Sequence, residues 1–348
     1  MKVLSGETLE NYKSNELKYK PEWNRRYFVC DVIDYLNEST EKVLAVSGLK
    51  GTGKTIGILQ ACEAFDILYV LIQNDNMDNG SDVIDLLMNT DKKYIVIDQY
   101  SWIKDRDELD RYLLTSVQNG KRIILTADVS MTLEVLNYGS LIHRVRVLHT
   151  TLFTYREYLD LYDYSPNKET CEKYLKEGGL FSEYALKSYK STKSYIDDAI
   201  VDSIAFYLHD EIDKETAKIL TYSVLYKAIC PSNLKETPVH KTDSTLVAFL
   251  EDAGINSSED IDKWYLNRVA DIFEQCGIIV KIPDLEQDDG SFNNRYYIVN
   301  PSITCQLIKS LYKHESIDEY VLDRVYESYT AVIMHLKNYI DCIGIYQE

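Results

Sequence analysis

The sequence predicts an α/β protein in which a mainly parallel sheet, covered by helices on both faces, is followed by a helical part and a smaller domain. Two observations predict the sheet: short apolar runs alternate with helical patterns, and a glycine-rich turn of fixed spacing follows the first run. A third observation, two apolar runs flanking a turn-rich stretch, predicts a hairpin in the last domain. We expect strands near residues 43–47, 67–73, 94–98, 122–127 and 144–149.

Length and charge limit the possible functions. The chain has 348 residues, enough for two or three domains, and a net charge of -18. Such a charge repels nucleic acid and anionic membranes unless a basic face is locally segregated, so nucleic acid is a possible but disfavoured partner. No signal peptide or membrane span is apparent, and the seven scattered cysteines are typical of buried free thiols in a reducing compartment. We therefore expect a cytoplasmic protein with no membrane partner.

Residues 1 to about 40 are polar and then helical in pattern. Arg25 and Arg26 lie just ahead of that helix. They could approach a ligand bound beyond the first strand, although two arginines at a solvated helix start are more common.

Residues 48–55 match the pattern G-x-x-x-x-G-K-[ST] at every fixed position. The glycines let the backbone curl so that successive N–H groups point at one phosphate, and the following helix adds its positive N-terminus. Lys54 brings a charge to the β- and γ-phosphates, and Thr55 offers a hydroxyl to Mg²⁺. A nucleoside triphosphate site is therefore predicted. Its binding residues are Gly48, Lys50, Gly51, Thr52, Gly53, Lys54, Thr55 and Ile56.

The third apolar run ends in an acid, Asp98, which is the arrangement that holds Mg²⁺ opposite Thr55. The next residue is Gln99. Many ATPases with an extra central strand have Glu there to polarise the attacking water, whereas Gln orients a water but cannot accept its proton. We therefore predict Lys54 and Gln99 as catalytic residues and expect slow or absent hydrolysis.

The fourth run leads into three polar residues, Thr126, Asp128 and Ser130. Each could contact the γ-phosphate or the water, or Asp128 or Ser130 could cap the next helix; both interpretations stay open. A guanine-reading Asn-Lys-x-Asp is missing, because residues 167–170 read Asn-Lys-Glu-Thr. ATP is therefore the expected nucleotide.

The fifth run has apolar residues at alternate positions and carries Arg144. Such an arginine can stabilise phosphate charge in its own chain or in a neighbouring subunit, and we predict a catalytic role for it. The alternative is a solvated strand arginine. His143 and His149 have no metal-ligand partners at suitable spacing and are interpreted as structural.

The rest of the chain is divided by pattern into smaller parts. A tyrosine-rich helical stretch, including Tyr184, Tyr189, Tyr195, Tyr207, Tyr222 and Tyr226, is interpreted as amphipathic core rather than a platform for stacking bases. The predicted domains are 1–157 (nucleotide-binding), 158–225 (helical, lid-like), 226–303 (winged helix) and 304–348 (helical segment).

A winged helix is predicted from three helices followed by a hairpin of 278–282 and 295–299. Its third helix offers few groups that could face a phosphate: Lys263, Asn267 and Arg268 stand among five acidic residues. We therefore favour a structural or protein-docking module over a DNA reader. Residues 304–348 carry apolar residues at helical spacing, and this apolar stripe could face a partner protein or the core of the chain itself equally well.

Together these motifs resemble the prokaryotic AAA-type P-loop ATPases that carry a winged helix and, usually, a C-terminal restriction-endonuclease-like domain of unknown function. The segments GLKGTGKT, YIVID, RIILTADVS and HRVRVLHTTLFTYREYLDL correspond to the family's motifs in order and spacing. The resemblance spans about residues 20–310. It implies an AAA-like ATPase with a helical lid, and it places Arg144 and Glu157 on the Arg and Glu of the family's last box.

This chain also departs from the family pattern. Gln99 replaces the catalytic Glu, and Ala127-Asp128 replaces Gly-Ser, so slow hydrolysis with retained binding is expected. His143 and Leu152 replace a Gly and a Pro of the family's box. Residues 178–181, Gly-Gly-Leu-Phe, resemble the family's Gly-Gly-Phe-Pro but lack its proline. The chain ends at Glu348, near where the nuclease-like domain would begin, so it either lacks that domain or is a truncated form.

Three functions follow as hypotheses. The first is a Mg²⁺-dependent ATPase whose nucleotide state moves the helical and winged-helix parts. The second is a regulatory module that binds ATP without hydrolysing it. The third is a DNA-binding regulator that uses the winged helix.

Overall fold

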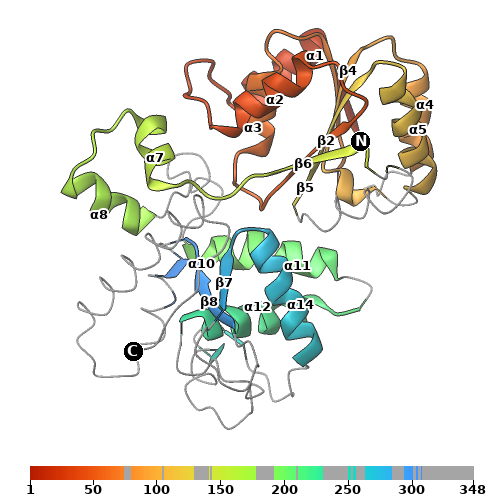
Figure 1. Cartoon of the computed structure of the whole chain (residues 1–348). Helices are drawn as coiled ribbons and strands as arrows, with labels where there is room; N and C mark the ends of the chain where they lie inside the picture. Colours follow the sequence, from red (N-terminus) through yellow and green to blue (C-terminus); the bar gives the residue numbers. More distant parts are fainter. Residues whose placement is uncertain are drawn as a thin grey trace, which may run out of the picture. The chain divides into compact units, whose positions relative to one another are not determined.

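The computed structural model describes most of the chain, in two compact units, Met1–Thr150 and Thr151–Glu348 (Figure 1). The described residues are 1–73, 80–103, 106–128, 141, 143–177, 192–208, 211–229, 250–251, 254–255, 263–283, 294–300, 303–304 and 307. Ser130, residues 178–181, Tyr184, Tyr189, residues 230–249 and most of the C-terminal helical segment are among the predicted features that lie outside them.

A six-stranded sheet organises the first unit, in the order β1-β3-β4-β5-β2-β6. All neighbouring pairs are parallel except β1 with β3, which is antiparallel. The five predicted strands are confirmed, with β3 ending two residues earlier and β6 starting one residue later than expected; β1 was not predicted. The strands are β1 (Lys2–Leu4), β2 (Val43–Ser47), β3 (Ile67–Leu71), β4 (Tyr94–Asp98), β5 (Arg122–Ala127) and β6 (Val145–His149).

One strand, β5, separates the strand that precedes the glycine-rich loop from the strand that ends in Asp98. In the register of β2 and β5, Ser47 lies opposite Ala127, and in that of β4 and β5, Ile97 lies opposite Leu125. The C-terminal ends of all three strands therefore meet at one edge, where ligands bind in open parallel sheets. This strand order, with the loop after β2, is the P-loop NTPase fold.

Helices cover both faces of the sheet, as Figure 1 shows. Val43 and Ala45 pack with α4 and α5 on one face, and Leu44 and Val46 pack with α1, α2 and α3 on the other. Successive strand residues point to opposite faces, so apolar runs without alternation are what a sheet buried on both sides requires. The helical elements are α1 (Gly6–Asn11), η1 (Tyr12–Glu16), α2 (Phe28–Asn37), α3 (Lys54–Ala61), α4 (Gly80–Met88), η2 (Tyr100–Trp102) and α5 (Asp107–Gln118).

A glycine sets the distance between α2 and α3. A Cβ at Gly57 would overlap the ring of Phe28, so only glycine lets the two helices approach this closely. The contact fixes the helix that follows the loop against the helix that Arg25 and Arg26 precede.

The second unit is built around α12 (Lys214–Ile229), which is buried along most of its length. Its other described elements are α7 (Tyr155–Tyr162), α8 (Lys168–Glu177), α10 (Thr192–Tyr195), η4 (Ile196–Val201), α11 (Asp202–Tyr207), α14 (Lys263–Gln275), β7 (Ile279–Pro283) and β8 (Asn294–Ile298). The predicted hairpin is confirmed, because β7 and β8 pair antiparallel. Residues 230–249 lie outside the described part, so the complete winged helix stays a prediction. Among the described helices, none has the length and apolar character needed to cross a membrane.

The tyrosines of this unit behave as core residues where they are described. Tyr195, Tyr222 and Tyr226 are buried, and Tyr207 is half-buried. Burial of the rings excludes base stacking by the first three and confirms the core interpretation for them. Tyr184 and Tyr189 lie outside the described residues.

Candidate functional site

The loop after β2 has the backbone that its glycines permit. Gly51 and Gly53 have φ of 82° and 81°, in the left-handed region that other residues rarely adopt. Gly48 has a positive φ as well, and a Cβ there would overlap Thr150. Helix α3 begins at Lys54, immediately after Gly53. The loop therefore ends at a helix N-terminus, which favours a bound anion.

Lys54 is buried, with 8% of its residue surface exposed. Its Nζ donates to the carbonyl oxygens of Gly48 and Leu49, the latter at 3.0 Å, and lies 3.2 Å from Oδ1 of Asp128. The ammonium is thus held inside the loop by two carbonyls and one carboxylate. The Thr52 N–H donates to the carbonyl oxygen of Leu49 at 3.3 Å, so this amide bonds within the loop instead of pointing toward a phosphate as the successive N–H groups of the loop were expected to do.

Asp98 and Thr55 are brought together as predicted. The Thr55 hydroxyl donates to Asp98 Oδ2 at 2.8 Å, although β2 and β4 are not neighbours in the sheet. Asp98 is 3% exposed and also accepts hydrogen bonds from the hydroxyls of Thr126, on Oδ1, and Tyr69, on Oδ2. Three hydroxyl donors therefore fix the carboxylate in one orientation.

Tyr69 is a site residue that the sequence reasoning missed. It lies on β3, next to β4, and its ring is fully buried. Burial first, and then the charge of Asp98, raise the pKa of the Tyr69 phenol well above its ordinary value, so it stays a hydrogen-bond donor. The sequence signal was faint: one tyrosine in an otherwise aliphatic strand.

Replacing Tyr69 by phenylalanine removes this hydroxyl and keeps the ring. Because a hydrogen bond to a charged group is lost, we expect the free energy of unfolding to fall by about 2 kcal/mol. The Mg²⁺ concentration needed for half-maximal nucleotide binding should rise about tenfold, because Asp98 is then less firmly oriented. Denaturant unfolding and a Mg²⁺ titration measure the two effects.

Tyr100→Phe is the matched control. Tyr100 is equally buried and donates to another carboxylate of the same unit, Asp110. It should lower stability similarly without changing the Mg²⁺ requirement. An equal Mg²⁺ shift in both variants would argue against a specific role for Tyr69.

Gln99 has an unusual backbone. Its φ of 63° and ψ of 41° are left-handed, which is uncommon for a residue with a side chain and recurs at functional sites. Its N–H donates to Thr126 Oγ1 at 2.8 Å. Its side-chain Oε1 is buried and has no hydrogen-bond partner within the described residues. A buried acceptor without a donor is costly, and a water molecule would satisfy it.

The end of β5 supplies two of its three candidates. Thr126 contacts Asp98 and Gln99, and Asp128 contacts Lys54. Thr126 therefore lies beside the end of β4, and Asp128 lies beside the loop. Whether a helix starts after Asp128 concerns residues outside the described part.

The loop is supported from two directions. Arg26 is buried and donates to the carbonyl oxygen of Thr52, whereas Arg25 lies at the surface with Glu63, at 2.9 Å. Thr150 Oγ1 lies 2.9 Å from Thr52 Oγ1 and donates to Ser47 O at 2.9 Å. Of the two arginines considered from sequence, Arg26 touches the loop; Thr150 was not predicted.

Arg144 is not brought to the loop. It precedes β6, and Val145 pairs with Val43 at the start of β2, whereas the loop follows the end of β2. The guanidinium is ion-paired with Glu41, and its side chain is 41% exposed. The predicted action of Arg144 on phosphate in its own chain is therefore corrected, because the length of β2 separates the two. A role toward a neighbouring subunit stays a prediction.

The donors at this site fit Mg²⁺. A hydroxyl and a carboxylate are hard oxygen ligands, and Mg²⁺ in nucleotide sites takes one or two protein oxygens, with phosphates and waters completing the set. Thr55 and Asp98 are the residues that would hold it. Among the described residues, no cluster of three or more His, Cys, Asp or Glu offers a separate metal site.

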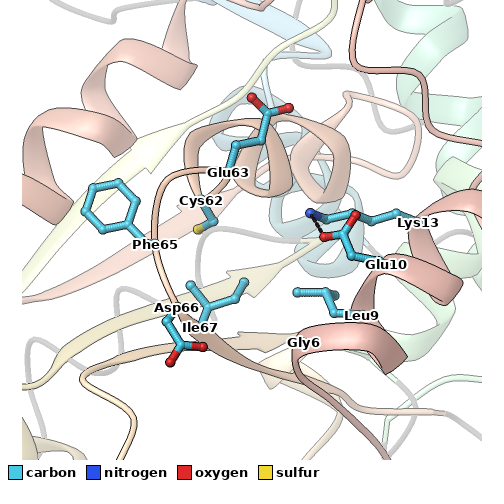
Figure 2. A pocket seen from close by; sticks show the side chains of 9 residues that line it. All are labelled: Gly6, Leu9, Glu10, Lys13, Cys62, Glu63, Phe65, Asp66 and Ile67. Atoms are coloured by element: carbon cyan, nitrogen blue, oxygen red, sulfur yellow. Dashed lines mark hydrogen bonds and ion pairs between the residues drawn. The ribbon is translucent and has the colours of Figure 1, made fainter.

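A recess of about 140 Å³ lies elsewhere in the first unit, between α1, η1 and the turn that joins α3 to β3 (Figure 2). Ile67 lies at the start of β3, so the recess is at the opposite edge of the sheet from the loop. Glu10 is ion-paired with Lys13, and burial raises the pKa of the Cys62 thiol to about 12. The remaining carboxylates of the recess, Glu63 and Asp66, are also paired, so no ligand chemistry is assigned to it.

No protein-family model and no curated protein sequence matches the chain. Solved structures that are similar to it at a low level include the following three. Orc1 of Aeropyrum pernix, in complex with DNA, is 10% identical with a TM-score of 0.33, covering 84% of this chain and 94% of that one. Drosophila ORC bound to DNA is 10% identical with a TM-score of 0.32, covering 82% of this chain and 87% of that one. RuvB of Thermotoga maritima is 14% identical with a TM-score of 0.37, covering 90% of this chain and 96% of that one. TM-scores this low do not establish a common fold. The fold of this chain is assigned from its strand order and from the glycine-rich loop after β2.

Proposed function

We propose that this chain is a Mg²⁺-dependent, ATP-binding ATPase of the AAA-like class with slow hydrolysis. The observation that carries the proposal is the contact of Thr55 with Asp98 at 2.8 Å beside a loop that ends at a helix N-terminus. Thr55 lies on α3, beyond the loop that follows β2, and Asp98 ends β4, which is not a neighbour of β2. Their meeting at one edge of the sheet is what a phosphate and metal site requires.

Each residue has a distinct part in this proposal. Lys54 and the loop amides bind the phosphates, and Thr55 with Asp98 binds the metal ion, which neutralises phosphate charge when bound. Tyr69 and Thr126 hold Asp98 in orientation through their hydroxyls. Gln99 Oε1, a buried acceptor without a partner among the described residues, positions the attacking water.

Slow hydrolysis follows from the chemistry of Gln99. An amide oxygen accepts a hydrogen bond from water but does not take up its proton, so general-base assistance is missing at this position. The same argument supports the second candidate, a switch that binds ATP without turning it over. Turnover separates the two.

Coupling between nucleotide and the second unit is proposed to run through Thr150. Its hydroxyl contacts Thr52 in the loop, and Thr151 is the first residue of the second unit. A shift of the loop on binding would therefore act on the chain where the second unit begins.

A DNA-reading role is less well supported than a protein partner. On α14, Arg268 is ion-paired with Glu211 at 2.6 Å and lies over the rings of Trp264 and Tyr207. Its charge is thus neutralised by a carboxylate, which lowers its value for a phosphate. Trp264 is 56% exposed, and an exposed tryptophan on this helix suits a protein contact.

The proposal is tested with purified protein by measuring Mg-ATP binding and phosphate release, with and without Gln99→Glu. We expect the wild type to bind ATP and release phosphate slowly. The variant should turn over at least about tenfold faster, because a carboxylate at this position accepts the proton of the water.

Gln118→Glu adds the same charge at an exposed position of the same unit and is the control. It should not change the rate. Fast turnover by the wild type, or no acceleration by Gln99→Glu, would contradict the assignment of Gln99; no ATP binding would overturn the proposal as a whole.

A further inference from the structure

The carboxylate of Asp128 occupies a place that the phosphate chemistry of the loop does not explain. Oδ1 lies 3.2 Å from Lys54 Nζ, and the side chains of Lys54 and Asp128 are 8% and 13% exposed. Lys54 is the residue whose ammonium meets the β- and γ-phosphates in this type of loop. A nucleotide and Asp128 therefore compete for the same ammonium.

The strand order explains why Asp128 reaches this place. Asp128 directly follows β5, whose last residue, Ala127, pairs with Ser47 at the end of β2. Gly48 N–H donates to the carbonyl oxygen of Ala127 at 3.2 Å, so the start of the loop and the end of β5 are joined by a hydrogen bond. The backbone holds Asp128 next to the loop.

A carboxylate at this place affects the binding of a nucleoside triphosphate, which has a γ-phosphate, differently from that of a nucleoside diphosphate, which has none. In sites of this type the β-phosphate is surrounded mainly by loop amides, whereas the γ-phosphate extends toward the strand ends, and here those ends carry Asp98 and Asp128. A bound Mg²⁺ would offset the charge of Asp98, but Asp128 is paired with Lys54, the ammonium that the γ-phosphate would also use. Like charges brought together in a partly buried site cost affinity.

We propose that Asp128 is a specificity-determining residue that disfavours the γ-phosphate, so that the site holds the nucleoside diphosphate at least as tightly as the triphosphate. This inference rests on the proposed nucleotide-binding function. It predicts that ADP competes effectively with ATP for the site.

The test compares two ligands in one protein. Isothermal titration calorimetry in constant Mg²⁺ gives Kd for ADP and for the β,γ-imido analogue of ATP, with wild type, Asp128→Asn and Asp128→Ser. The ratio of the two Kd values is internally controlled, because any loss of folded protein affects both titrations equally. The matched control is Asp66→Asn, which removes the same charge from a carboxylate of the same unit paired with Lys92.

We expect wild type to bind ADP at least as tightly as the analogue. Both Asp128 variants should shift the ratio toward the triphosphate by about tenfold, as removal of one nearby like charge predicts, and Asp66→Asn should leave it unchanged. A shift below about threefold in both variants, or a shift toward ADP, would overturn the inference while leaving nucleotide binding intact. Binding of neither nucleotide by any of the four proteins would overturn the proposed function, and the inference with it.

Discussion

Replacing Lys54 by alanine is expected to weaken nucleotide binding at least about 100-fold, because a buried charged partner of the phosphates is removed. The loss is larger than that of one ordinary hydrogen bond for a second reason. Without the ammonium, Asp128 keeps its negative charge beside the loop and repels the phosphates. Calorimetric titration with Mg-ATP measures the change.

The control for Lys54 is Lys92→Ala, a lysine of the same unit that pairs with Asp66 at the surface. It should bind as the wild type does. The double variant Lys54→Ala/Asp128→Asn should recover part of the lost affinity, since the effects of replacing contacting residues are not additive. A Lys54→Ala protein that folds and binds normally would show that the loop does not hold phosphate.

Asp98→Asn is expected to have the second large effect. The amide keeps the size of the side chain but not its charge, so Mg²⁺-dependent nucleotide binding should fall about 100-fold. The hydroxyls of Thr55, Thr126 and Tyr69 also lose a charged acceptor. Stability should therefore fall by about 3 kcal/mol, which denaturant unfolding measures.

Asp110→Asn separates these two effects. Asp110 is a part-buried carboxylate of the same unit that accepts a hydrogen bond from a buried tyrosine, Tyr100. Its replacement should lower stability and leave the response to Mg²⁺ unchanged. Equal loss of Mg²⁺ dependence in both variants would mean that Asp98 acts only through folding.

The sequence was sufficient for five of the six strands of the sheet and for the centre of the site. Short apolar runs that alternate with helical patterns predict a parallel sheet covered on both faces. The loop motif together with Asp98 then indicates which strand ends must meet. Arg144 was misplaced because the sequence puts it at the start of a strand without saying whether that strand runs parallel or antiparallel to β2. The parallel register of β6 against β2, with Val145 opposite Val43, puts it at the edge away from the loop.

Supporting residues were harder to predict, because their role exists only in three dimensions. Tyr69 reaches Asp98 from a neighbouring strand, and Thr150 reaches Thr52 from 98 residues away in sequence. Neither has a pattern of its own. Arg26 was considered, but the sequence could not tell it apart from Arg25, which lies at the surface.

The short strand β1 has a consequence for handling the protein. It pairs Lys2–Leu4 with Tyr69–Leu71 and so covers backbone groups of β3 that would otherwise form an open sheet edge. Lys2 carries a charge on that edge, in an ion pair with Glu16 at 2.6 Å. Charged, very short edge strands discourage self-association of sheets. Trimming the first five residues, or displacing them with a fused tag, would uncover an apolar strand and promote aggregation.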